Sequence, residues 1–208
     1  KVAEIHNLPF LCTYEHQDIV SHNHPHYAGE LGLRPPEPIR KNALEADVVL
    51  VVGHRFNGVP NMAYKFPSSK QTFIHVIPDP NTIGKIFRTD MGIVADSKNF
   101  LEQLSTIEKK KTNKERDEWV KLCHHRYLNN NATQPPRNAN DGLDFAHLID
   151  ALGELAPENS IITNDAGNFT SWMHHRFPFR SSMILIGSEI GAMGMGIPAG
   201  IAAALRFP

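Results

Sequence analysis

The stretch Gly187–Ala204, GSEIGAMGMGIPAGIAAA, decides how the fold of this chain is interpreted. Four glycines in its first ten residues allow a sharp backbone turn or a close approach to a ligand. An alanine-rich run follows, with Pro198 early enough to be tolerated in a first helical turn. The apolar residues Met183–Ile186 precede the glycines. The segment therefore predicts a strand, a glycine loop and a helix, and α/β proteins bind cofactors at such loops.

The glycine spacing differs from the dinucleotide-binding fingerprint. Gly191, Gly194 and Gly196 follow G-x-x-G-x-G rather than G-x-G-x-x-G. The fingerprint also includes an acidic residue about twenty positions after the glycines, and the sequence ends at Pro208 before that position. Taken alone, the stretch is better explained by an Ala/Gly helix packed tightly on a sheet.

Length, charge and cysteine content narrow the class of protein. The 208 residues suffice for one large domain or two small ones. A formal net charge of −1 gives no electrostatic reason to expect nucleic acid or a membrane surface as a partner. Cys12 and Cys123 belong to no motif, which favours a reducing, cytoplasmic compartment. We find no signal peptide and no apolar run long enough to span a bilayer.

Apolar runs predict a parallel sheet in the first half of the chain. Asp47–Gly53 contains a continuous apolar run rich in β-branched valine that ends in glycine, which is typical of a strand covered on both faces. Leu8–Thr13, Thr72–Ile77 and Met91–Asp96 are further expected strands. Helical patterns lie between them, including one from Lys98 to about Glu108 that Asp96 or Ser97 caps. Strands alternating with helices indicate βαβ units.

The composition changes between Glu108 and Asp141. The charge run Lys109–Arg116 is typical of a solvated helix face or a linker. Asn129–Pro136 is polar and contains prolines, which predicts a linker. We therefore expect one domain over residues 1–128, a linker over 129–141 and a second domain over 142–208.

The second domain is predicted to continue the α/β pattern. Leu143–Leu155 has the spacing of an amphipathic helix, and Ser160–Thr163 is a short expected strand. The turn Asn164–Phe169 leads into an expected helix, Thr170–His175. Such a turn can bind phosphate through free backbone amides, and the alternative is an ordinary turn capped by its Asp and Asn.

Histidines are frequent, but their spacing does not predict a metal site. Three of them alternate in His22–Gly32, which we expect to be a solvent-facing loop. Imidazole suits zinc, copper or nickel, yet no Cys or Asp supplies the other half of a site at a known spacing. The adjacent pairs His124-His125 and His174-His175 point in different directions on a helix, so they are poor chelates.

Several segments resemble the acetolactate synthase group of thiamine-diphosphate enzymes. The glycine stretch resembles the group's G-x-M-G-x-G-x-P-A segment. Ala46–Asn57 resembles A-D-L-V-L-V-I-G-T-R-F-N, and Pro78–Lys85 resembles D-x-D-P-x-x-I-G-K. His24–Gly29 is similar to the H-P-x-Y-x-G loop of the group's middle domain, and Asp165–Asn168 to its D-x-G-N segment. The matches keep the family's order and cover nearly the whole chain.

The resemblance implies a fold of two α/β parts. A Rossmann-like middle domain with a parallel sheet, incomplete at its N-terminus, precedes the start of a second α/β domain that binds thiamine diphosphate. Both ends look cut, so we expect the chain to be part of a longer protein. The full enzyme would be a lyase or transferase that decarboxylates a 2-oxo acid or uses one in carbon–carbon ligation. It would be a homo-oligomer, either a dimer or a tetramer.

The resemblance also implies which parts of the machinery are missing. In the family, the glutamate that activates the cofactor lies in a pyrimidine-binding domain before the middle domain. The G-D-G…N motif that holds Mg²⁺ and the diphosphate would follow Pro208. We therefore expect the 208 residues to be inactive alone, with no catalytic residue and no metal ligand among them.

By position, the resemblance assigns five residues to the thiamine diphosphate site. Asn168 and the amides around Ala166 and Gly167 match residues near the diphosphate. Gly191 matches the residue whose carbonyl accepts a hydrogen bond from the aminopyrimidine. Met193 matches the apolar residue that holds the cofactor bent.

A second cofactor and two other functions remain as alternatives. Arg55 and Phe56 lie where FAD-binding members contact FAD, but Leu33–Pro36 replaces the end of the family's H-P-x-x-x-G-M-x-G-x-x-G, which argues against FAD. The chain could instead be a non-catalytic Rossmann-like module that binds FAD or ADP. A purely structural or regulatory role is the third hypothesis. A pyrimidine domain upstream and a G-D-G…N motif downstream would favour the enzyme.

Overall fold

The computed structural model describes residues 1–108, 113–132, 135 and 142–207. Most of the charge run's lysines, eight residues of the expected linker, and Pro208 lie outside them. The elements in chain order are α1 Val2–His6, β1 Phe10–Thr13, the 3₁₀ helix η1 Gln17–Ile19, β2 Tyr27–Leu31, α2 Glu37–Leu44, β3 Val48–Val52, β4 Thr72–Ile77, η2 Pro80–Thr82, β5 Met91–Val94, α3 Ser97–Leu104, α4 Lys114–Asn130, α5 Phe145–Leu155, β6 Ile161–Thr163, α6 Thr170–Arg176, β7 Ile184–Ile186 and α7 Gly196–Arg206.

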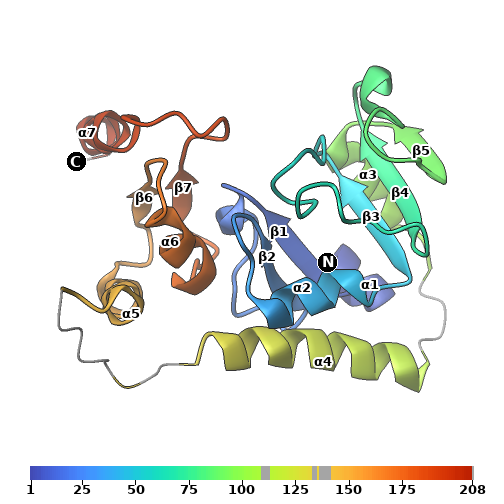
Figure 1. The fold of residues 1–208 in the computed structure, drawn as a ribbon, viewed down its shortest axis with the longest axis horizontal. Coiled ribbons are helices and arrows are strands. Elements are labelled where there is room, and N and C mark those ends of the chain that lie inside the picture. Colours follow the sequence, from blue (N-terminus) through green and yellow to red (C-terminus); the bar gives the residue numbers. More distant parts are fainter. Residues whose placement is uncertain (109–112, 133–134, 136–141, 208) are drawn as a thin grey trace.

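Every strand pair of the described chain is parallel (Figure 1). The pairs form three sheets, with the orders β1-β2, β3-β4-β5 and β6-β7. In the central sheet, β3 runs beside β4 from Val48 opposite Thr72 to Val52 opposite Val76. The α/β class with parallel sheets, predicted from alternating strands and helices, is confirmed. The division into residues 1–128, 129–141 and 142–208 stays a prediction.

The burial of β3 differs from the prediction. Val49 and Val51 are buried in a core that includes Phe73, whereas Val48 and Leu50 are 48% and 36% exposed. The expectation that both faces are covered is therefore wrong for the described chain. A β-branched run fits the pleat of a strand in either case, so it does not report how many faces are covered.

The histidine-bearing segment His22–Gly32 is not a solvent-facing loop. Its residues Tyr27–Leu31 form β2, and all five of them are buried beside β1. Gly29 has a φ of +107°, and a Cβ there would lie 2.8 Å from the Cδ1 of Ile39, so α2 packs directly on the strand. His22 is buried as well, with its ring stacked on Tyr27 at 4.2 Å between centroids. The sequence YAGEL lacks the β-branched residues by which strands are recognised.

Helix α4 packs against α2 and β2 (Figure 1). Asn42 of α2 joins these elements, because its Nδ2 donates to the carbonyl of Ala28 at 2.9 Å and to that of Cys123 at 3.0 Å. The cysteine thiols of this region, Cys12 and Cys123, are both buried and free.

Replacing Asn42 by Ala is expected to lower the free energy of unfolding by about 2 kcal/mol, because two buried carbonyls lose their donor. Urea unfolding followed by circular dichroism measures this change. The matched control is Asn81→Ala on the surface, for which we expect a change of about 0.5 kcal/mol or less. Equal losses in the two variants would contradict this account of Asn42.

In the second part of the chain, α5 packs on α6 and α7 packs on β6. The core contains Ile149, Phe177, Phe179, Met183 and Leu185. The amphipathic helix predicted over 143–155 is confirmed as α5, and both predicted strands are present as β6 and β7. Within the described ranges, no helix combines the length and apolar character that a membrane span requires.

Candidate functional site

Two loops leave the same edge of the β6-β7 sheet. Because the strands are parallel neighbours, residues 164–169 after β6 and residues 187–195 after β7 begin side by side. The amide of Asn164 donates to the carbonyl of Ile186 at 2.9 Å, which joins the start of the first loop to the end of β7. The carboxyl edge of a parallel sheet is where α/β proteins bind ligands.

Asp165 links the two loops. Its carboxylate accepts hydrogen bonds from the amide of Gly194 at 2.8 and 3.1 Å and from the amide of Gly196 at 3.1 Å. The bonds from Gly196 and Gly194 hold the pKa of Asp165 below its usual value. The aspartate thus caps the start of α7 from the neighbouring loop. Asp165 also accepts from the amide of Ala166 at 2.8 Å, so Ala166 has no free amide to offer an anion.

The five residues assigned to a cofactor lie on these two loops. Ala166, Gly167 and Asn168 form the turn before α6, and among described groups we find no acceptor for the amides of Gly167 and Asn168. Gly191 has a φ of +71°, and a Cβ there would meet nothing within 4 Å. Met193 is 84% exposed, so it does not pack beneath the alanine-rich helix.

The residues matched to FAD contacts are placed differently. Phe56 is buried, and its ring packs against Phe66 and Phe73 at 5.6 and 5.8 Å between centroids. Arg55 is exposed beside it. The ring of Phe56 therefore belongs to the core of the first part and is not available to a flavin.

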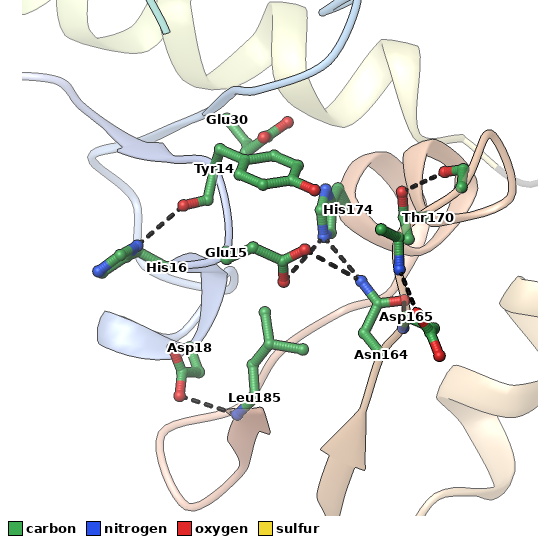
Figure 2. Close-up of polar contacts among 12 residues, drawn as sticks. Tyr14, Glu15, His16, Asp18, Glu30, Asn164, Asp165, Thr170, His174 and Leu185 are labelled. Atoms are coloured by element: carbon green, nitrogen blue, oxygen red, sulfur yellow. Dashed lines mark hydrogen bonds and ion pairs between the residues drawn. The ribbon is translucent and has the colours of Figure 1, made fainter. Parts of the chain in front are cut away.

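A buried polar cluster joins the two parts of the chain, and Figure 2 shows three of its members, Glu15, Glu30 and His174. The Nε2 of His174 lies 3.3 Å from Oε2 of Glu15, and the Nε2 of His175 lies 3.6 Å from Oε2 of Glu30. The adjacent positions of the two histidines predict a poor chelate, and neither glutamate belongs to a sequence motif. Among the residues that the structure describes, no group of three or more His, Cys, Asp or Glu could hold a metal ion.

Burial decides the charges of this cluster. Burial, and secondarily the charge of Glu15, raises the pKa of Glu30 to about 8. Burial, and secondarily His174, lowers the pKa of His175 to about 4. At neutral pH both groups are therefore uncharged, and their 3.6 Å contact is not an ion pair. A cavity of about 10 Å³, lined partly by Glu30, His174 and His175, has room for about one water molecule.

Comparison with known proteins identifies the family. Residues 1–104, half of the chain, match the family described as thiamine pyrophosphate enzyme, central domain. The chain therefore belongs to the thiamine pyrophosphate enzymes, and its first part is their Rossmann-like central domain.

Relatives match over the rest of the chain as well. The acetolactate synthase isozyme 1 large subunit of Escherichia coli is 31% identical over 211 residues, which cover 100% of this chain and 36% of that protein. A probable acetolactate synthase large subunit of Methanocaldococcus jannaschii is 26% identical, again over 100% of this chain and 36% of the relative. The pyruvate oxidase of Lactiplantibacillus plantarum is 25% identical over 97% of this chain and 33% of its own length. The chain thus spans about a third of the length of the curated relatives it matches.

Proposed function

We propose that the chain forms the central domain and one wall of the cofactor site of an acetolactate-synthase-like enzyme. This enzyme would be a lyase or transferase that decarboxylates a 2-oxo acid or uses one as donor in carbon–carbon ligation. The observation that carries the proposal is the pair of joined loops at the carboxyl edge of β6 and β7. One loop offers the exposed amides of Gly167 and Asn168, and the other offers the exposed side chain of Met193.

The residues fit the two ends of thiamine diphosphate. Gly167 and Asn168 would bind the diphosphate with their backbone amides and the Asn168 side chain, whereas Ala166 would only shape the turn, because its own amide donates to Asp165 at 2.8 Å. Gly191 would accept a hydrogen bond through its carbonyl, and Met193 would fill the space between the rings. When bound, the cofactor supplies an electron sink for the carbanion left by decarboxylation. The protein's own task here is to hold the cofactor bent and to keep water from the rings.

Mg²⁺ is proposed as the second cofactor. Asp165 lies nearest the diphosphate turn, but its oxygens already accept hydrogen bonds from Gly194 and Gly196. Magnesium requires free carboxylates together with phosphate oxygens. The carboxylates that hold it are therefore proposed to come from residues other than those described, and the structure gives no argument for FAD.

We propose that the enzyme is a homo-oligomer, either a dimer or a tetramer, and that it works in the cytoplasm. Five apolar side chains on the glycine loop and α7 are more than half exposed, and large exposed apolar surfaces mark interfaces. These side chains are Ile190, Met193, Ile197, Ile201 and Leu205.

The test compares two forms of the protein. Protein made from the complete reading frame is expected to release CO₂ from pyruvate only when thiamine diphosphate and Mg²⁺ are added. The 208 residues alone are expected to give no turnover above a blank. If the complete protein binds FAD or ADP but gives no cofactor-dependent turnover with any 2-oxo acid offered, the nucleotide-binding alternative replaces the proposal.

A further inference from the structure

The segment that follows β1 contacts the second part of the chain through several of its residues. Asp18 accepts a hydrogen bond from the amide of Leu185 in β7 at 2.8 Å (Figure 2). The amide of His22 donates to the carbonyl of Phe179 at 2.9 Å. The ring of Tyr14 meets that of His174 edge to face, at 5.1 Å between centroids.

Glu15 lies at the centre of this contact and touches the base of both cofactor loops. Its Oε1 is 3.4 Å from Nδ2 of Asn164, the first residue after β6. A Cβ added to Gly187, the first residue after β7, would lie 1.9 Å from Oε2 of Glu15. The carboxylate therefore fills the space against both loop origins. His174 faces the same Oε2 at 3.3 Å, and Glu15 is buried.

The backbone of Glu15 is held in an unusual conformation. Its φ is +58°, in the left-handed region that residues other than glycine rarely adopt. Such a conformation persists only where the surrounding structure determines it, and it is found preferentially at functional sites. Here the neighbouring contacts of Tyr14 and Asp18 fix the segment on either side.

From Glu15, a hydrogen bond reaches the first loop through Asn164, and a packing contact reaches the second loop at Gly187. Asn164 accepts from the amide of Asp165 at 3.0 Å, and Asp165 in turn holds Gly194. On the other side, Ser188 follows Gly187 directly and accepts from the amides of Gly191 and Ala192. The residues assigned to the diphosphate and those assigned to the rings are thus both connected to one carboxylate.

We propose that Glu15 of the central domain is a positioning residue that sets the spacing of the two cofactor loops. It does not touch the reacting atoms; it acts through Asn164 on one loop and by direct contact with Gly187 on the other. The effect of Glu15 on catalysis rests on the proposed function, whereas its effect on the spacing of the loops does not. Side chains that bind a cofactor must be held to about 0.5 Å by such supporting contacts.

The first experiment measures amide hydrogen exchange without cofactor, on protein from the complete reading frame. In Glu15→Gln, exchange in residues 164–169 and 187–196 is expected to rise about tenfold, because an amide nitrogen replaces one of the two carboxyl oxygens that face Asn164, His174 and Gly187. The matched control is Glu30→Gln, because Glu30 is also buried and its carboxyl group is uncharged at neutral pH. In that control, exchange of both loops is expected to stay within about twofold of the unmodified protein.

A second experiment keeps the inference testable if Glu15→Gln does not fold. Gly187→Ala introduces a methyl group where the Glu15 carboxylate lies, and Glu15→Ala removes that carboxylate. The increase in loop exchange in the double variant should therefore be smaller than the sum of the increases in the two single variants. Gly32→Ala is the control, because its Cβ would lie 1.7 Å from Oε1 of Glu30 and would clash with a different carboxyl group. It should leave the hydrogen exchange of both loops unchanged.

The outcomes separate this inference from the proposed function. Loop exchange in Glu15→Gln within about twofold of the unmodified protein, or strict additivity of Gly187→Ala and Glu15→Ala, would overturn the role of Glu15. Failure of the unmodified protein to bind thiamine diphosphate in a calorimetric titration would overturn the proposed function instead. In that case the exchange result still decides whether Glu15 positions the loops.

Discussion

Replacing Glu30 by Gln is expected to stabilise the protein above pH 7, by an amount that grows with pH. Glu30 is buried, and burial, with the charge of Glu15 second, raises its pKa from 4.5 to about 8. Between these two values the folded state holds a proton that the unfolded state has released. The free energy of unfolding therefore falls as pH rises, by at most about 1.4 kcal/mol for each pH unit.

The buried histidines restrict the pH range over which this fall in the free energy of unfolding can be observed. The pKa values of His22 and His175 are lowered from 6.5 to about 4, chiefly by burial. Between pH 4 and 6.5 the unfolded state therefore binds more protons at these residues, so their contribution to stability rises with pH and opposes that of Glu30. From about pH 6.5 to 8 the fall due to Glu30 is unopposed by them.

Urea unfolding at each pH unit from 5 to 9 measures both profiles. The difference between Glu30→Gln and the unmodified protein should increase up to about pH 8 and then level off, because the histidine contributions cancel in the difference. Glu102→Gln on the exposed surface of α3 is the control, with a change of about 0.5 kcal/mol or less at every pH. Parallel profiles for Glu30→Gln and the unmodified protein would show that Glu30 is ionised in the folded state.

Local patterns in the sequence were sufficient to predict much of the fold. The strand predicted at Thr72–Ile77 has the same bounds as β4, since an apolar run with β-branched residues specifies a strand without help from distant contacts. The cap expected at Asp96 or Ser97 is Asp96, which accepts from the amide of Asn99. The glycine loop and the alanine-rich helix are also where they were predicted, with α7 beginning at Gly196.

The polar contact between the two parts could not be predicted in the same way. Glu15 and His174 are 159 positions apart, and neither belongs to a motif. Whether a glutamate is buried depends on which surface meets it, and here that surface comes from a part of the chain that is distant in sequence. Asp165 illustrates the same limit, because its role in capping α7 depends on the loop that follows β7 and not on its own turn.

Replacing Met193 by Ala is expected to lower the kcat of the complete enzyme by about 100-fold, because displacing reacting atoms by about 1 Å costs that much. We expect no change in melting temperature, because Met193 is 84% exposed and leaves no cavity in the core of the described chain. Cofactor affinity should change much less than kcat, because the amides of Gly167 and Asn168 that would bind the diphosphate are untouched.

The measurement requires melting temperature, cofactor affinity and kcat on one preparation of each variant. Leu205→Ala is the matched control, because Leu205 is an apolar side chain on α7 that is 81% exposed and lies nine residues beyond the start of the helix. If the two variants lose activity equally, a general effect of the apolar surface explains the loss, for example through assembly. If Met193→Ala keeps full kcat, the side chain has no part in holding the cofactor bent, and the exposed loop would then have to bind something else.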